Sequence, residues 1–62
     1  MNGVTLADLR TNKKLTQREL AQIINVAPSS IAMYESGERT PSLGRAKEIA
    51  KYFKVSVESI IF

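Results

Sequence analysis

Apolar residues recur along this chain at the spacing of α-helices rather than with the alternation of β-strands. From Leu6 onward they stand three, four or seven positions apart, which places them on one side of a helix with about 3.6 residues per turn. Capping and turn-forming residues interrupt this pattern at short intervals. The pattern predicts an all-α fold, a compact five-helix bundle that forms one domain over residues 1–62.

Residues 16–36 carry the clearest local signals, beginning with a helix and a sharp bend. Thr16 followed by Glu19 is a capping box, which starts a helix over about 17–24. Asn25 follows, and asparagine tolerates the left-handed backbone conformation that ends a helix abruptly. We therefore expect the chain to turn at Asn25.

A second helix is expected directly after this turn. Pro28 suits the first turn of a helix over about 28–36, and Gly37 suits its end. The small side chain of Ala21 allows the two helices to cross closely. The two helices and the turn between them predict a helix-turn-helix over about 16–36. Its expected framework is Leu20, Ala21, Ile24, Asn25, Ile31 and Tyr34.

Two further helices flank this unit. Thr5 or Asn2 can cap a first helix that runs to about Lys13, and Ser42 can cap a fourth helix that runs to about Lys54. The residues expected to point inward are Leu6 and Leu9 in the first helix, and Leu43, Ala46, Ile49, Ala50 and Phe53 in the fourth.

The C-terminal end is unusually apolar for so small a domain. Ser56 is the expected cap of a fifth helix over about 57–62. Val55, Ile60 and part of Ile61 are expected to seal the bundle. An exposed remainder indicates an interface between two copies, and the alternatives are a frayed end or a truncated longer chain. The expected dimer interface consists of Val57, Ile61 and Phe62.

Composition narrows the possible chemistry. The 62 residues include no cysteine, no histidine and a single aspartate, so disulfides, thiolate or imidazole metal sites and histidine-based catalysis are excluded. We therefore expect no enzymatic activity, no cofactor, no metal and no small-molecule ligand. The net charge of +3 is compatible with a polyanionic partner. No apolar run approaches the ~20 residues that cross a bilayer, so a soluble, cytoplasmic protein without a membrane partner is expected.

The segments LTQRELAQ (15–22), YESGERTPS (34–42) and VSVESI (55–60), with the stretch 26–31, resemble the lambda-repressor-like, or Cro (XRE-type), helix-turn-helix family of bacterial and phage DNA-binding domains. The resemblance covers essentially the whole chain. It implies a five-helix fold, a homodimer and operator DNA as the ligand, with the third helix in the major groove.

The resemblance also implies which residues face DNA. Gln17 matches the family's phosphate-binding position at the start of the second helix. Other expected phosphate contacts are Arg18, Lys13, Lys14, Arg39 and Thr40. The expected base-reading positions are Pro28, Ser29, Ser30, Ala32 and Met33.

These base-reading positions depart from the usual family pattern. Relatives often carry Gln, Arg, Lys or Asn there, and those side chains form paired hydrogen bonds with bases. Here only two serine hydroxyls are available, so we expect thymine methyls, DNA shape and water to carry more of the specificity. Alternatively, Met33 is simply a half-buried helix residue.

Two charged positions form an expected structural pair. Family members often join an arginine of the first helix to the glutamate near the end of the third helix, and Arg10 and Glu35 stand at those places. The alternative is that both are solvated surface charges. Lys47, Lys51 and Lys54 are expected to form a solvated stripe on the fourth helix.

The sequence thus predicts a sequence-specific DNA-binding transcription regulator, a repressor that binds a pseudo-palindromic operator as a homodimer. The alternative is a protein-interaction module, antitoxin-like or coactivator-like, whose DNA binding is secondary. The small number of hydrogen-bonding groups at the base-reading positions favours that alternative.

Overall fold

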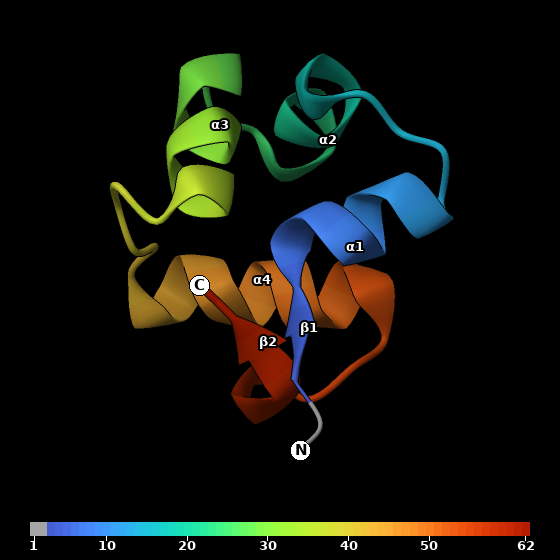
Figure 1. Ribbon diagram of the computed structural model, residues 1–62, viewed down its shortest axis with the longest axis vertical. Coiled ribbons are helices and arrows are strands. Elements are labelled where there is room, and N and C mark those ends of the chain that lie inside the picture. The colour runs from blue at the N-terminus through green and yellow to red at the C-terminus, as the bar shows by residue number, and fades with distance from the viewer. Residues whose placement is uncertain (1–2) are drawn as a thin grey trace.

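The computed structural model describes residues 3–62, so Asn2, the alternative cap of the first helix, lies outside the described residues. Within that range the fold has four α-helices, one 3-10 turn and two short strands (Figure 1). Their order is β1 (Val4–Thr5), α1 (Leu6–Asn12), α2 (Gln17–Ile24), α3 (Pro28–Ser36), α4 (Leu43–Phe53), η1 (Val57–Ser59) and β2 (Ile60–Ile61). The mainly helical character is confirmed, whereas the fifth helix is not.

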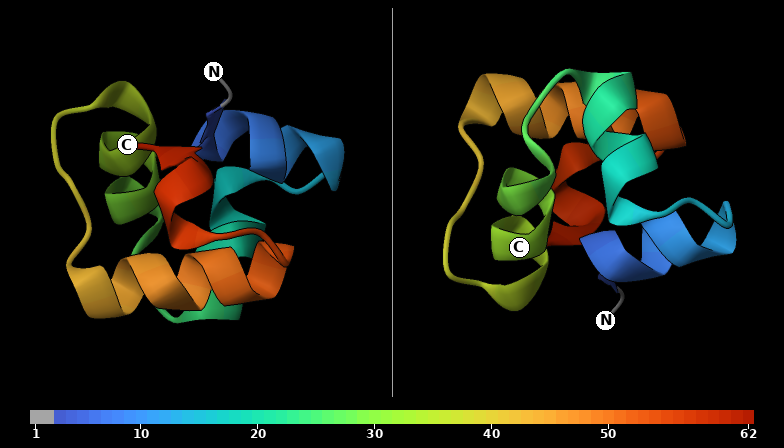
Figure 2. Two further views of the ribbon diagram at one scale, coloured as in Figure 1. Left: turned by 90° about the horizontal axis from the view of Figure 1, so that it is seen from below. Right: turned by 90° about the horizontal axis from the view of Figure 1, so that it is seen from above.

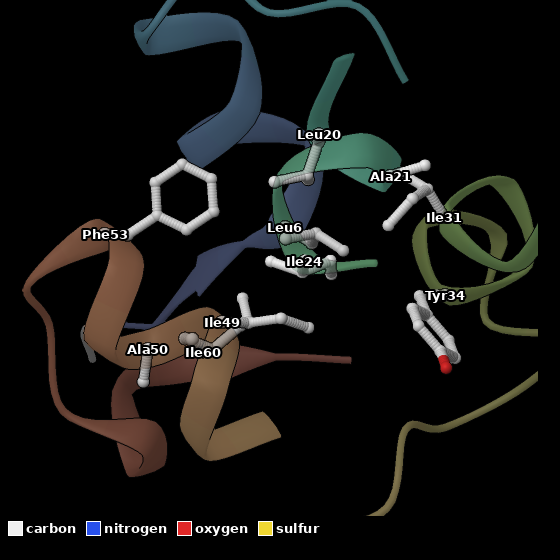
Figure 3. Packing of buried hydrophobic residues seen from close by; sticks show 10 residues of the cluster. All are labelled: Leu6, Leu20, Ala21, Ile24, Ile31, Tyr34, Ile49, Ala50, Phe53 and Ile60. Carbon is white, nitrogen blue, oxygen red and sulfur yellow. The ribbon is translucent and has the colours of Figure 1, made fainter. Parts of the chain in front are cut away.

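The four helices surround one hydrophobic core. In Figure 1, α4 runs beneath α2 and α3, and Figure 2 shows the same arrangement from below and from above. Each helix contributes one almost completely buried aliphatic side chain: Leu6, Leu20, Ile31 and Ile49. Figure 3 shows these four packed with the other buried members of the cluster, which are Ala21, Ile24, Tyr34, Ala50, Phe53 and Ile60.

The signals at the start of α2 act as the sequence predicts. The Thr16 hydroxyl accepts a hydrogen bond from the Glu19 N–H at 3.0 Å, and the Glu19 carboxylate accepts one from the Thr16 N–H at 2.8 Å. This capping box satisfies backbone donors that the first turn of a helix leaves unpaired. Thr5 caps α1 in the same way, since its hydroxyl accepts from the Asp8 N–H.

A left-handed residue follows each of the four helices, and in three of them this residue is not glycine. Asn25 has φ 62° after α2, Lys14 has φ 58° after α1, and Lys54 has φ 59° after α4. The next N–H then bonds the carbonyl five residues back, which is the Schellman arrangement. The N–H of Leu15 donates to the carbonyl of Arg10. In the same way, Val26 donates to Ala21, and Val55 donates to Ala50. Each donor residue packs its apolar side chain against the core, so the same device directs three chain reversals.

The expected fifth helix over 57–62 is wrong. The segment forms the single turn η1 and then β2, which pairs in parallel with β1 so that Val4 faces Ile60 and Thr5 faces Ile61. Ser56 makes no side-chain cap. Instead, the Ser59 hydroxyl and N–H both bond the Ser56 carbonyl. β-branched residues favour the extended backbone, and β1 offers unpaired backbone groups nearby.

The inward position predicted for Leu43 is also wrong, because this side chain is 65% exposed. The other four predicted inward residues of α4 are buried. Leu43 occupies the first position of the helix, and Pro41, two residues earlier, is buried instead. Helical spacing identifies the face of a helix but not how far along the helix the core extends.

Replacing Lys54 with glycine is expected to stabilise the fold by about 1 kcal/mol, since a side chain in the left-handed region costs roughly that much. Lys51→Gly is the matched control in the same helix, where glycine should destabilise by about 1 kcal/mol. Urea unfolding of both variants measures the two shifts. Equal destabilisation by both glycines would contradict the role assigned to the left-handed cap.

Candidate nucleic-acid interface

One side of α3 is fixed in the core and the other side is presented to solvent. Ile31 is 0% exposed and Tyr34 is 8% exposed. The predicted base-reading positions lie away from these two residues. Pro28 and Ser29 are exposed, while Ser30, Ala32 and Met33 are half-buried. Neither serine hydroxyl takes part in a hydrogen bond within residues 3–62, so both are available to an external partner.

The chain after α3 turns back on the helix end. Gly37 has φ 84°, a left-handed conformation that glycine adopts without strain. The Arg39 N–H then bonds the Met33 carbonyl at 3.3 Å. The Ser36 hydroxyl donates to the Glu38 carboxylate at 3.2 Å. Arg39 and Thr40 are thereby held in an exposed position directly beyond α3.

A polar network locks α3 to the two preceding helices. Arg10 Nε and Nη2 donate to the two carboxylate oxygens of Glu35, at 2.6 and 3.2 Å. The remaining terminal nitrogen, Nη1, donates to the Leu15 carbonyl at 2.8 Å. The side chains of Arg10 and Glu35 are only 16% and 10% exposed. A two-bond contact of this kind fixes geometry as well as charge, so the sequence-predicted pair holds α1, the following loop and α3 in one arrangement.

The carboxylate of Glu35 also stabilises the protonated, charged form of Arg10. Its hydrogen bond raises the pKa of Arg10 above the usual value, against the opposing effect of burial, and its negative charge adds to the increase. Arg10 therefore remains charged throughout the accessible pH range.

Gln17 has a structural contact that the sequence did not reveal. Its amide nitrogen donates to Glu35 Oε1 at 2.9 Å, which joins the first residue of α2 to α3. Because a carboxylate only accepts hydrogen bonds, the amide must present its nitrogen to Glu35. The same nitrogen carries a second N–H, which is the donor that a phosphate contact would use. Spacing along the chain gave no signal of this link, since the partners are 18 residues apart.

The predicted phosphate-binding cations do not all lie together. Arg18 is exposed in the first turn of α2, beside Gln17. Lys13 instead places its ammonium group 5.6 Å from the centre of the Tyr52 ring in α4. Lys14 is exposed at the left-handed position between α1 and α2.

Arg45 is a structural residue that sequence reasoning missed. Its Nη1 donates to the carbonyl of Ile24, the last residue of α2, at 2.9 Å, and to the Glu48 carboxylate at 2.7 Å. A cation at this end complements the partial negative charge of the helix terminus. The spacing of Arg45 and Glu48 could have suggested their pairing, but the contact with Ile24 depends on tertiary packing.

At the C-terminus, some residues lie where the sequence predicts and others do not. Ile60 is buried and Val55 packs against the core, as expected. Ile61, expected both to seal the bundle in part and to join the interface, is 55% exposed, which is compatible with both expectations. Val57 and Phe62, expected with Ile61 in an exposed interface, are half-buried and pack against the core. In the β2 strand, successive side chains point to opposite faces, so Ile60 points inward and Ile61 outward.

Comparison with protein families matches residues 6–60 to a family described as helix-turn-helix. The chain belongs to this family. The match extends over nearly all of the fold, from α1 to β2, and confirms the resemblance to XRE-type domains.

Three relatives of this helix-turn-helix chain illustrate the range of proteins that contain such a domain. The HTH-type transcriptional activator BcrR of Enterococcus faecalis is 38% identical over 90% of the chain and 28% of its own length. The cryptic phage CTXphi transcriptional repressor RstR of Vibrio cholerae is 30% identical over 90% of the chain and 50% of its own length. Multiprotein-bridging factor 1a of Arabidopsis thaliana is 61% identical over 53% of the chain and 23% of its own length.

The helix-turn-helix chain therefore spans between about a quarter and a half of these relatives. No solved structure matches it. Among residues 3–62, no helix is long and apolar enough to cross a membrane.

Because Arg10 and Glu35 are largely buried, removing either partner should leave an uncompensated charge. We expect Arg10→Met and Glu35→Leu each to lower the free energy of unfolding by about 3 kcal/mol, and the double variant to lose less than either single variant. Urea unfolding of all four proteins measures this coupling. Additive losses in the double variant would show that the two charges do not depend on one another.

Proposed function

We propose that this chain is the DNA-binding domain of a sequence-specific transcription regulator, with α3 inserted in the major groove. The observation that carries the proposal is the two-sided arrangement of α3. Ile31 and Tyr34 anchor one side in the core, and the base-reading edge from Pro28 to Met33 is left free. A rigid helix with one accessible edge is the shape that the major groove admits.

The chemistry of this edge favours apolar readout of thymine. Ala32 and Met33 present methyl and thioether groups, and these contact the C5-methyl of thymine rather than hydrogen-bonding groups. Ser29 and Ser30 add two hydroxyls, which can bond bases directly or through water. Specificity then depends strongly on the exact placement of α3, because shape and methyl contacts tolerate little displacement.

Backbone contacts are proposed to position α3 on the duplex. Gln17 and Arg18 lie at the start of α2, where free N–H groups also face outward. Arg39 and Thr40 lie beyond the end of α3. The two groups flank the base-reading edge in the chain, as phosphate contacts on either side of a groove require. Lys14, exposed between α1 and α2, completes the proposed set, whereas Lys13 lies over the Tyr52 ring of α4 and is left out of it.

We further propose that the domain acts as a homodimer on a pseudo-palindromic operator. The exposed Ile61 lies between the partly exposed Val57 and Phe62 in the C-terminal segment, and a two-fold contact there would cover all three. Such a dimer presents two α3 helices to half-sites about 34 Å apart.

Repression is the proposed outcome of binding, although relatives are named as an activator and as a repressor. Occupying an operator excludes other proteins from the same DNA, and this requires no additional contact. Activation requires, in addition, a surface that contacts another protein.

A protein-interaction module is the second candidate. Two observations favour it: the base-reading edge has only two hydrogen-bonding side chains, and one relative is named as a multiprotein-bridging factor. A salt titration separates the candidates, because phosphate contacts make specific DNA binding weaken steeply with salt. DNA binding that weakens with salt and shows no sequence preference at any salt concentration would favour the interaction module.

Selection of bound sequences from random duplex DNA tests the main proposal. We expect a two-fold symmetric site with half-sites separated by about one helical turn. A single asymmetric half-site would contradict the dimer while retaining DNA recognition. Absence of any enriched sequence would contradict the proposed function itself.

Replacing thymine by uracil in the selected half-site tests the mode of readout. Uracil lacks only the C5-methyl, so each contacted position should lose about four-fold in affinity, the value of one buried methyl group. Substitution of 7-deazaguanine, which removes a major-groove acceptor, is the control and should have a smaller effect. The opposite order of effects would show that hydrogen bonds dominate recognition.

A further inference from the structure

A groove separate from α3 lies where the C-terminal end of α2 packs along α4, close to the residue that follows α1. The groove is open to solvent and has a volume of about 790 Å³. In Figures 1 and 2, α3 lies at one side of the molecule and the C-terminal ends of α1 and α4 lie at the other side in every view. None of the base-reading residues lines the groove, so the groove is not part of the base-reading edge.

The groove combines apolar surface with positive charge. Ile23 is 44% exposed here, and half-buried Tyr52 and buried Ile24 contribute further apolar surface. The rim carries Lys13, Lys51 and Lys54, together with Arg45 and Glu48, which pair with each other at 2.7 Å. Within residues 3–62, none of the three lysines forms a salt bridge. The groove thus has an excess positive charge around an exposed aliphatic side chain.

We propose that this groove binds an acidic, amphipathic segment of a partner protein. Leucine or aromatic side chains of the segment would cover Ile23 and Tyr52, and its carboxylates would meet the three rim lysines. Both parts are needed to explain the groove: apolar surface gives affinity through burial, and rim charges select an acidic partner and speed its approach. An amphipathic helix laid in a groove is a common form of peptide recognition.

Charge and shape distinguish this occupant from the two obvious competitors. A second copy of this chain carries the same excess of lysines, so two such grooves repel each other. Duplex DNA would satisfy the lysines but not Ile23, because a phosphate backbone is polar and convex and cannot fill a concave apolar surface. Lys47, Lys51 and Lys54 are all exposed, as expected of a solvated stripe, and Lys47 alone of the three lies outside the groove.

This inference does not rest on the proposed function, since the groove contains none of the base-reading residues. A fluorescent synthetic helix of about 16 residues is a suitable probe, with leucines spaced i, i+3, i+4 and i+7 and glutamates between them. We expect saturable binding to the full 62-residue chain, weakened by salt. Backbone amide shifts should be centred on Ile23 and Tyr52 and absent from α3.

Two variants with matched controls test the two parts of the groove. Lys51→Glu should weaken binding about five-fold, whereas Lys47→Glu, the same charge change on the same helix, should not. Ile23→Ser should weaken binding about ten-fold, whereas Leu43→Ser, at another exposed position outside the groove, should not. Circular dichroism confirms that all four variants are folded.

Three results would overturn the inference. The first is equal binding of a probe with the same composition but scrambled leucine positions. The second is an equal effect of a variant and its matched control. The third is a loss of duplex DNA binding by Lys51→Glu as large as the loss of peptide binding, which would make the groove a nucleic-acid surface.

Discussion

The contact on which the rest of the site depends is the paired hydrogen bond from Arg10 to the carboxylate of Glu35. These residues are separated by 25 positions, yet the contact fixes the end of α3 against α1. Gln17 donates to the same carboxylate, and Arg10 also donates to the Leu15 carbonyl. Because Glu35 accepts from both α1 and α2, α3 cannot shift along its axis without breaking several charged hydrogen bonds in a mostly buried place.

Core packing supplies a second constraint on α3, which acts on the rotation of the helix rather than on its position along its axis. Ile31 has no exposed surface and packs with Leu20 and Ile24 of the preceding helix in one cluster. Dense interiors resist small displacements, so this packing fixes the rotation of α3 and hence which residues face outward. The apolar contacts and the polar network together leave one orientation for the edge from Pro28 to Met33.

Much of this fold could be predicted because its signals are local. The capping box at Thr16, the left-handed Asn25 and the proline at the start of α3 each act within a few residues, and the bounds of α2 and α3 are as predicted. The Arg10 and Glu35 positions came from family resemblance rather than from spacing. The left-handed lysines at 14 and 54 gave no signal, since lysine has no intrinsic preference for that conformation.

The prediction of a fifth helix failed for two reasons. A six-residue window is too short to separate helical from extended spacing. The strand pairing of Ile60 also depends on Val4, which is far away in sequence.

Rigid anchoring of α3 would allow an edge with so few hydrogen-bonding side chains to serve in the proposed recognition of DNA. Side chains with long, flexible hydrogen-bonding groups can adjust to a helix that is loosely placed. Ala32 and Ser29 cannot, because they reach only a short distance from the backbone. Their contacts form only if the backbone itself is correctly placed, so readout by small side chains requires the rigid anchoring that Arg10, Glu35 and Gln17 provide. The groove beside Ile23 contains none of the base-reading residues, so the proposed partner would leave the edge of α3 accessible. A fold this small can therefore offer DNA and a protein partner separate surfaces at the same time.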